Sequence, residues 1–277
     1  MSDKRKIIIP IVLVLLIGGY FIFKYVYREN PNVISGSGTI EVTEVDISSK
    51  LSGRIVKLNA EEGSAVRAGQ LLVELNHDEL SAQFESAKEQ VKQLDTQTKN
   101  SDSNFKRAKE LLAAGGYSQQ AFDRDETLFK VTSSQYESAK QNLNLLKAQI
   151  DNAYLVTPIS GVVLQKNSEL GEMASPGMSV MTIGDMSKPW LKIYVPEDRI
   201  PRIKLGDKAY VSLDAYDRKF EGKVTYISST AEFTPKNVQT KEDRVRQVFA
   251  VKIALENKEG IFKPGMPADA VINASNN

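Results

Sequence analysis

The stretch Gly53-Arg-Ile-Val-Lys-Leu-Asn-Ala-Glu-Glu-Gly-Ser-Ala-Val-Arg-Ala-Gly69 decides the fold, because its pattern recurs later in the chain. The second copy has its glycines at Gly161, Gly171 and Gly177, so each glycine returns after 108 residues. Both copies consist of short alternating apolar segments separated by glycine turns, which is the pattern of small β-strands. We therefore predict one small all-β domain with two equivalent halves. Its repeated glycines are expected where the backbone has a positive φ or where two backbone segments approach each other closely.

The interval between the two copies lacks helix breakers. No proline lies between Pro31 and Pro158, and the only glycines between the halves are the adjacent pair Gly115-Gly116. Apolar residues on each side of this pair recur at steps of three and four, the heptad pattern of helices that pack along one seam. We predict two antiparallel helices with arms of about 35 residues, or about 50 Å. Asp78 is the expected N-cap of the first helix.

The predicted seam contains small and polar residues at Thr98, Ser101 and Asp125. These residues bury little apolar area, so a free-standing hairpin would be marginally stable. Two interpretations stay open at this point. The hairpin is either a solvated spacer or one of several copies that pack side by side.

The composition excludes several classes of function. The chain has 277 residues, with 36 Lys and Arg against 35 Asp and Glu, one His and no Cys. A net charge of +1 gives no basic surplus for nucleic-acid binding. The lack of Cys and the single His exclude thiol catalysis, disulfides and the usual zinc sites. No phosphate-binding glycine loop is present, and we expect no cofactor.

Two sets of polar residues are weak candidates for chemistry. His77 stands where a helix is expected to begin, with no nucleophile or partner base placed near it, so we favour a capping or solvent-exposed role. Glu41, Glu44 and Asp46 lack companions with metal-ligand spacing. We therefore predict neither a catalytic nor a metal site.

The first 28 residues predict a membrane anchor. Lys4-Arg5-Lys6 precedes seventeen uncharged residues, Ile7 to Phe23, and Lys24 and Arg28 follow. This is the length and the flanking pattern of a short transmembrane helix. A cleaved signal peptide is the alternative, but no small-residue cleavage site follows the apolar run. We predict a single pass through a bacterial inner membrane, with a cytoplasmic N-terminus and the bulk of the chain in the periplasm.

Short alternating segments return after Trp190. A single helical turn or short helix is expected over residues 196–203. The expected strands cover residues 191–195, 208–213, 220–227, 248–255 and 268–272. Five or six such strands with one small helix are typical of a compact β-barrel.

These segments resemble the HlyD-type membrane fusion proteins, which are periplasmic adaptor subunits of export systems. The first glycine stretch resembles half of a biotinyl or lipoyl domain, and Thr157-Pro-Ile-Ser-Gly-Val-Val163 resembles the start of the second half in these adaptors. Lys263-Pro-Gly-Met266 resembles part of their β-barrel. The stretch 231–244 resembles the barrel loop of adaptors paired with ABC-type exporters. The resemblance covers residues 36 to 272.

The resemblance implies a multidomain protein of mixed α and β structure. Its implied parts are a cytoplasmic tail with a transmembrane anchor (1–28), a lipoyl-like barrel-sandwich hybrid domain in two halves (36–77 and 154–186), an α-helical coiled-coil hairpin (78–153) and a β-barrel domain (187–275).

The resemblance also implies a non-enzymatic adaptor in a tripartite export or efflux system. Its partners would be an inner-membrane exporter, with the ABC type favoured, and a TolC-like outer-membrane channel. Copies of the chain would assemble in a ring of six and form part of the conduit. Two alternatives stay open: a membrane-tethered coiled-coil spacer, and a biotin- or lipoyl-type carrier. The carrier is disfavoured because helices replace the turn that displays the modified lysine.

The hairpin tip is the implied contact with the outer-membrane channel. In adaptors that dock onto TolC-like channels, the sequence of the hairpin tip resembles a spaced pattern. The pattern is Arg, three residues, Leu, six residues, Ser, and an Asp five positions later. Arg107, Leu111, Ser118 and Asp123 match this pattern. An Arg offers a forked donor, a Leu an apolar contact, and a Ser a helix cap or a bond across an interface. Purely local roles for Ser118 and Arg107 are the alternative.

Gln165 is a second position carried over from the resemblance. It stands four residues past Gly161, on an expected loop of the lipoyl-like domain. A Gln at this place lines a channel constriction in some family members. A solvated loop amide is the alternative interpretation.

Overall fold

The computed structural model describes residues 33–233 and 247–273. The predicted anchor at 1–28 and most of the 231–244 loop lie outside this range. The chain divides into two compact units, which we name the barrel unit (Met1–Thr43 with Met186–Asn277) and the hairpin unit (Glu44–Asp185). Among the described residues, no helix combines the length and the apolar character needed to cross a membrane.

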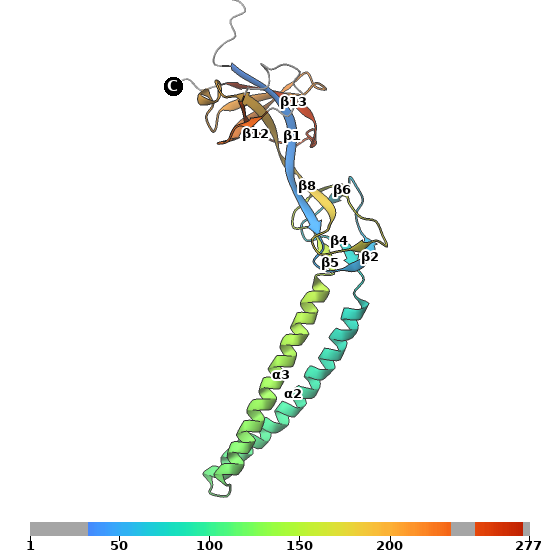
Figure 1. The fold of residues 1–277 in the computed structure, drawn as a ribbon, viewed down its shortest axis with the longest axis vertical. Coiled ribbons are helices and arrows are strands. Elements are labelled where there is room, and N and C mark those ends of the chain that lie inside the picture. Colours follow the sequence, from blue (N-terminus) through green and yellow to red (C-terminus); the bar gives the residue numbers. More distant parts are fainter. Residues whose placement is uncertain (1–32, 234–246, 274–277) are drawn as a thin grey trace, which may run out of the picture. The chain divides into compact units, whose positions relative to one another are not determined.

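The barrel unit is a closed sheet of six strands (Figure 1). The strands hydrogen-bond in the order β12-β10-β9-β13-β1-β8, and β12 pairs again with β8 to close the barrel. A short strand, β11 (Glu232–Phe233), adds to β12, and a 3₁₀ helix, η1 (Ile200–Arg202), follows β8. Two of the six strands, β1 (Val33–Ser48) and β8 (Ser179–Pro196), also continue into the hairpin unit. The other four are β9 (Lys208–Ser212), β10 (Lys219–Ile227), β12 (Gln247–Leu255) and β13 (Pro267–Asn273).

Strand β1 supplies a barrel strand that we predicted to lie elsewhere. It pairs in register with β13, from Val33 opposite Asn273 to Thr39 opposite Pro267. Ile40 lies fully buried in the barrel core. Residues 36–43, which we placed in the lipoyl-like domain, therefore belong to the barrel unit. Their alternating apolar pattern predicts a strand but does not name the sheet that the strand joins.

The β part of the hairpin unit is built from both copies of the glycine pattern. One sheet has the order β5-β4-β2-β7, while β6 pairs with β3 and β8. Strand β2 of the first half thus pairs with β7 of the second, and β3 pairs with β6. The predicted split domain is confirmed. Its remaining strands are β2 (Gly53–Leu58), β3 (Ala65–Val66), β4 (Leu71–Leu75), β5 (Tyr154–Val156), β6 (Gly161–Lys166) and β7 (Met173–Ala174).

The repeated glycines serve the two purposes that the sequence predicts. Gly161 allows close approach, because a Cβ there would lie 2.2 Å from the carbonyl oxygen of Gly184. Gly53 is less confined, with its nearest neighbours 3.3 Å from such a Cβ. The glycines that need positive φ, between +81° and +90°, are Gly63, Gly69, Gly171 and Gly177.

Five turns in the two units share one construction. In each, a glycine with positive φ stands third, as type II turns require. The fourth residue donates its backbone N–H to the carbonyl of the first, and its side chain accepts from the N–H of the first. These paired bonds fix the turn and leave the second residue at its tip. The five turns are Glu61–Ser64, Arg67–Gln70, Glu169–Glu172, Lys204–Asp207 and Lys263–Met266.

The interval without breakers forms two long helices, α2 (Asp78–Ala113) and α3 (Gln119–Asp151), which are inserted between β4 and β5 (Figure 1). All the predicted seam positions are buried or partly buried, so the heptad pattern identified the contact faces. The N-cap of α2 is His77, not Asp78 as predicted, and its side chain caps no backbone N–H. Asp78 and Glu79 lie in the first turn, where acidic groups favour the helix dipole.

We predict that the β part of the hairpin unit folds without the helices. Strands β4 and β5 pair across the insertion, and the buried core contains no side chain of α2 or α3. Joining Asn76 to Ala153 through a short turn, within a chain covering residues 44–185, should give a folded domain. Proton NMR should show dispersed amide signals. A collapsed, undispersed spectrum would mean that the two halves depend on the hairpin.

Candidate functional site

The hairpin tip is closed by a helix cap with two glycines. The N–H groups of Gly115 and Gly116 donate to the carbonyls of Leu112 and Leu111, at 3.0 and 2.9 Å. Gly115 has a φ of +75°, as this Schellman arrangement requires. The carbonyls of Leu111 and Leu112 in the last turn of α2 are thereby satisfied, and the chain reverses within five residues.

The structure places the four predicted tip residues on the surface. Arg107 and Leu111 stand one turn apart on α2 and therefore share a face. Leu111 is 43% exposed although it is apolar, and Arg107 has no ion pair among the described residues. Asp123 accepts a hydrogen bond from Gln119 Nε2 at 2.8 Å. No ion pair within the described part of the chain therefore explains Arg107, and Leu111 keeps much of its apolar surface in contact with solvent.

Ser118 is the N-cap of α3. Its Oγ accepts from the N–H of Ala121 at 3.3 Å. The local role that the sequence offered as an alternative is therefore present. A capping Oγ retains a donor hydrogen and stays exposed, so the cap leaves Ser118 able to contact a partner.

Aromatic side chains behind the tip hold the two helices together. The ring of Phe105 lies 5.6 Å from the rings of both Phe122 and Phe129, and it stacks on the latter. The hydroxyl of Tyr117 donates to Asp125 at 2.7 Å, and this bond raises the pKa of Tyr117. The polar seam position Asp125 thus orders the chain just after the turn.

The polar seam residues in the middle of the hairpin form hydrogen bonds that were not predicted. Ser101 Oγ lies 2.6 Å from Thr132 Oγ1, and Thr98 Oγ1 donates to the carbonyl of Thr132 at 3.0 Å. Ser101 and Thr132 are at most 4% exposed. Their short side chains let the helices approach, and hydrogen bonds replace the missing apolar contact. The heptad pattern signals this layer only as small polar residues on facing seams.

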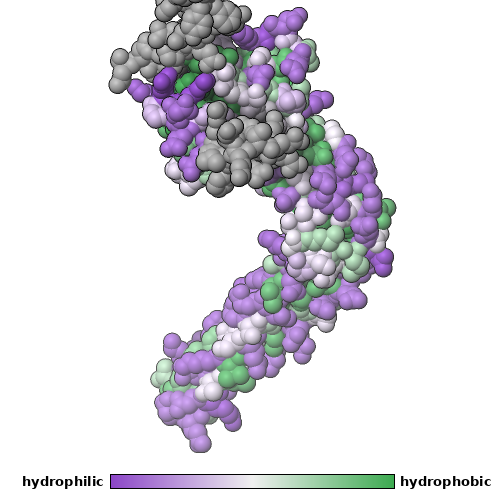
Figure 2. Space-filling model, turned by 45° about the horizontal axis from the view of Figure 1, so that its top comes forward, coloured by the Kyte–Doolittle hydropathy of each residue, from purple (hydrophilic) through white to green (hydrophobic). Residues whose placement is uncertain are grey.

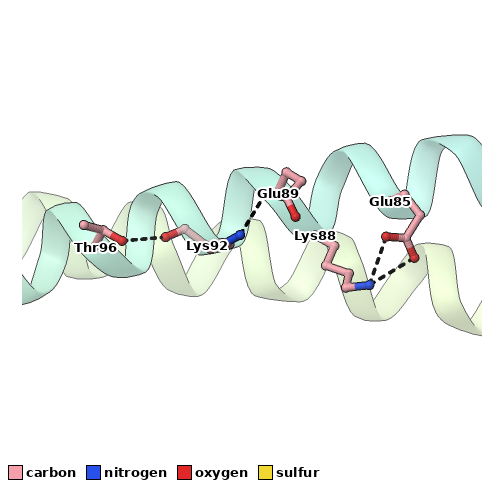
Figure 3. A network of polar contacts seen from close by, with 5 residues as sticks. All are labelled: Glu85, Lys88, Glu89, Lys92 and Thr96. Carbon is pink, nitrogen blue, oxygen red and sulfur yellow. Dashed lines mark hydrogen bonds and ion pairs between the residues drawn. The ribbon is translucent and has the colours of Figure 1, made fainter.

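The outer faces of both helices carry exposed ion pairs, with few exposed apolar side chains among them. On α2, Lys88 pairs with Glu85 and Lys92 pairs with Glu89 (Figure 3). Such exposed pairs contribute only a few tenths of a kcal/mol each and leave the face charged and solvated. Hydrophobic surface along the hairpin is broken into separate spots (Figure 2). The exposed apolar side chains of α3 are Leu128, Val131 and Leu145.

Gln165 lies in strand β6 and not in a loop as predicted. It is exposed and stands opposite Thr182 of β8. The hydroxyl of Thr182 donates to Asp46 at 2.6 Å, so the neighbouring side chains form an ordered polar surface. Glu61 and Glu169 hold the adjacent Lys166 ammonium at 2.8 and 3.0 Å, and this contact raises the pKa of Lys166. The amide of Gln165 is therefore carried on a fixed strand.

His77 ties the two ends of the insertion together. Its Nδ1 lies 3.0 Å from the carbonyl of Leu75, and its Nε2 lies 2.9 Å from the hydroxyl of Tyr154. A carbonyl only accepts, so in the neutral ring Nδ1 carries the proton and Nε2 accepts from Tyr154. Within the described ranges, no three His, Asp or Glu residues gather where they could hold a metal ion.

Two domain families match the chain. A model described as "RND MFP, barrel-sandwich hybrid domain" matches residues 43–184, which is more than half of the chain. The chain belongs to the RND-type membrane fusion protein family. A second model, described as "CusB-like, beta-barrel domain", matches residues 188–276. The first match begins at residue 43, so residues 36–42, which lie in the barrel unit, fall outside it.

Individual relatives of this membrane fusion protein are distant but match over most of their length. The "UPF0194 membrane protein in asrC 5'region" of Acidithiobacillus ferridurans is 26% identical, over 100% of this chain and 98% of the relative. The solved membrane fusion protein Spr0693 of Streptococcus pneumoniae R6 is 19% identical, with a TM-score of 0.69 over 88% of this chain and 100% of that one. MacA of Actinobacillus actinomycetemcomitans is 19% identical, with a TM-score of 0.60 over 88% and 79%. The two structures share the fold.

Substitutions at Ser118 separate helix capping from partner contact in this membrane fusion protein. Ser118→Ala removes the cap and should cost about 1 kcal/mol of hairpin stability. Ser118→Asp keeps an acceptor for the N–H of Ala121 and should unfold like the parent, but it replaces the hydroxyl donor with a charge. Thermal unfolding and an export assay should be measured together. If Ser118→Asp loses export but keeps the stability of the parent, Ser118 contacts a partner. If Ser118→Ala is the one variant that loses export, and it loses stability as well, Ser118 acts as a helix cap.

Proposed function

We propose that this membrane fusion protein is the periplasmic adaptor of a tripartite export system. It links an inner-membrane exporter to a TolC-like outer-membrane channel and forms part of the conduit between them. The observation that carries this proposal is the closed hairpin tip, where Leu111 is 43% exposed and the exposed Arg107 has no ion pair with a described residue. The 36 residues of α2 give the tip a reach of about 54 Å. An ABC-type exporter is favoured by the resemblance of the 231–244 loop.

The proposal includes an anchor in the inner membrane. Residues 7–23 span the bilayer once, the N-terminus is cytoplasmic, and the bulk of the chain is periplasmic. A reporter fused after Asn277 should be active only in the periplasm. The mature protein should retain residues 7–23. Recovery of a soluble chain beginning near Ser35 would contradict the anchor.

The proposal also includes self-assembly in a ring of six. In such a ring the exposed amide of Gln165 lines a constriction, and the exposed apolar residues of α3 lie against neighbouring hairpins. The chain itself carries no catalytic role, so the partner exporter supplies the energy. The carrier alternative lacks support, because α2 and α3 occupy the place of the lysine-bearing turn.

Cross-linking from the hairpin tests the channel contact. The chain has no Cys, so Leu111→Cys introduces a single attachment point for a photo-activated cross-linker. In cells, this position should cross-link to the outer-membrane channel. Leu145→Cys is the matched control, because Leu145 is also exposed but lies near the far end of α3. A membrane-tethered spacer would give no channel adduct from either position.

A further inference from the structure

One end of the barrel unit carries an exposed leucine beside two lysines. Leu205 is 68% exposed, the highest value among the large apolar side chains of residues 33–233 and 247–273. Lys208 and Lys223 stand directly opposite each other on β9 and β10. Both are exposed, and neither forms an ion pair with a described residue. Like charges placed opposite each other destabilise an antiparallel pair, so this arrangement is not explained by folding.

The turn that carries Leu205 is rigid. It is one of the five turns of shared construction, with Gly206 at a φ of +96°. The N–H of Gly206 also donates to the carbonyl of Val224 at 2.8 Å, and Asp207 Oδ2 accepts from the N–H of Lys204 at 2.8 Å. Leu205 is therefore held outward by its backbone, and a partner would not have to order the turn.

This turn lies at the end of the barrel where β1 begins. Ile272 of β13 pairs with Ile34 on one side and with Ala209 on the other. Both β1 and β9 run antiparallel to β13, so Val33 and Lys208 start their strands at the same end. Nine residues, 24–32, separate Val33 from the predicted span that ends at Phe23. The ten steps from Phe23 to Val33 reach at most about 35 Å when the chain is fully extended.

We propose that this barrel end is a second membrane contact. Leu205 enters the interfacial layer of the bilayer, and Lys208 and Lys223 bind anionic lipid headgroups. An apolar tip flanked by lysines is the chemistry of interfacial binding. Two carboxylates, Glu221 and Glu256, line the same depression as the lysines, but Glu256 is already paired with Lys258 at 2.7 Å. The inference rests on the proposed anchor, which brings this end near the membrane.

The hairpin unit contains a built-in control. Its turn Glu169-Leu170-Gly171-Glu172 has the same construction, and Gly171 likewise donates to a neighbouring strand, at the carbonyl of Ile55. Leu170 is 63% exposed, close to the value for Leu205. Its flanking residues are glutamates, of which Glu169 is paired with Lys166 at 3.0 Å, and Arg54 donates to the carbonyl of Gly171 at 2.9 Å. The two turns therefore present the same side chain, but the turn of Leu170 has two carboxylates beside its cations where the turn of Leu205 has two lysines without an ion pair to a described residue.

Fluorescent labelling of the full chain tests the contact. Because the chain lacks Cys, Leu205→Cys and Leu170→Cys each accept one environment-sensitive label. The labelled proteins are reconstituted into vesicles of phosphatidylcholine with phosphatidylglycerol, or of phosphatidylcholine alone. In the anionic vesicles, the label at position 205 should be shielded severalfold from aqueous iodide and quenched by lipid-borne quenchers. The label at position 170 should stay accessible to iodide.

Lys208→Glu, added to the labelled Leu205→Cys chain, tests the headgroup contact. It places a carboxylate opposite Lys223, so it relieves the repulsion across β9 and β10 and should fold at least as well as the parent. One lysine near an anionic surface contributes about a fivefold effect, so the shielding should fall markedly. Unchanged shielding in this variant would overturn the role of the lysines.

Vesicle flotation separates the inference from the proposed anchor. A chain that floats with the vesicles but leaves positions 205 and 170 equally accessible overturns the membrane contact alone. A chain that does not float overturns both the anchor and the contact. If the label at position 205 is shielded equally in vesicles of phosphatidylcholine alone, the assignment of anionic headgroups is overturned. Shielding that appears only when an inner-membrane exporter is co-reconstituted makes this end a protein interface and overturns the proposal.

Discussion

Gly161→Ala should destabilise the hairpin unit by about 3 kcal/mol or more, the largest stability effect that we expect from one added methyl group within this unit. The new Cβ would lie 2.2 Å from the carbonyl oxygen and 2.9 Å from the carbonyl carbon of Gly184. Both glycines lie in the paired strands β6 and β8, where Val162 stands opposite Gly184. Backbone atoms cannot move aside without loss of this pairing, so the clash must be relieved by separating the strands.

Gly53→Ala is the matched control, because Gly53 is the counterpart of Gly161 in the first half. Its Cβ would meet Asn76 O and Leu75 Cβ at 3.3 Å, a contact that small shifts relieve. We expect a cost of about 1 kcal/mol. Urea denaturation of the full chain, followed by a probe in the hairpin unit, measures both variants. Equal losses at the two glycines would contradict the structural difference between the halves.

Arg107→Asp should abolish export without changing thermal stability. The guanidinium has no intramolecular ion pair among the described residues, so folding loses nothing when it is replaced. At a channel interface, the substitution would set a carboxylate against the acceptors that we expect to bind Arg107. A repulsion of about 2 kcal/mol or more corresponds to at least a thirtyfold loss of channel binding. Export rate and pull-down of the channel provide the measurement.

Lys109→Asp controls for the change in charge. Lys109 is also an exposed cation of α2 without an ion pair in the described part of the chain, but it stands two residues away and so points to a different face. Export should stay within about twofold of the parent, as expected for a solvated surface change. Equal loss in both variants would indicate a general effect of hairpin charge. Normal export in Arg107→Asp would count against docking through this residue.

The parts of the fold that the sequence predicts are those set by short-range patterns. Heptad spacing identified the contact faces of α2 and α3, and repeated glycines identified the two halves of the split domain. The position of residues 36–43 could not be predicted in this way. Their pairing with β13 joins segments more than 200 residues apart, and nothing in a local alternation of apolar residues names such a distant partner.

The candidate site shows the same division between local and distant information. The cap by Ser118 follows from its place after the two glycines, and the exposure of Arg107 and Leu111 follows from the heptad positions around them. The bond between His77 and Tyr154 could not be predicted, because the two residues stand at opposite ends of the insertion. For the same reason Gln165 was placed in a loop, since its strand is defined by pairing with β8.

The insertion of the hairpin between two paired strands makes its length an independently variable trait. Leu75 N donates to the carbonyl of Ala153 at 2.9 Å, so the chain leaves and re-enters the β domain at adjacent points whatever lies between them. Adding seven residues to each arm would lengthen the hairpin by about 10.5 Å and preserve the seam. Mutation and selection can therefore match the protein to a wider or narrower periplasm in heptad steps, with no change to the β domain that carries the hairpin.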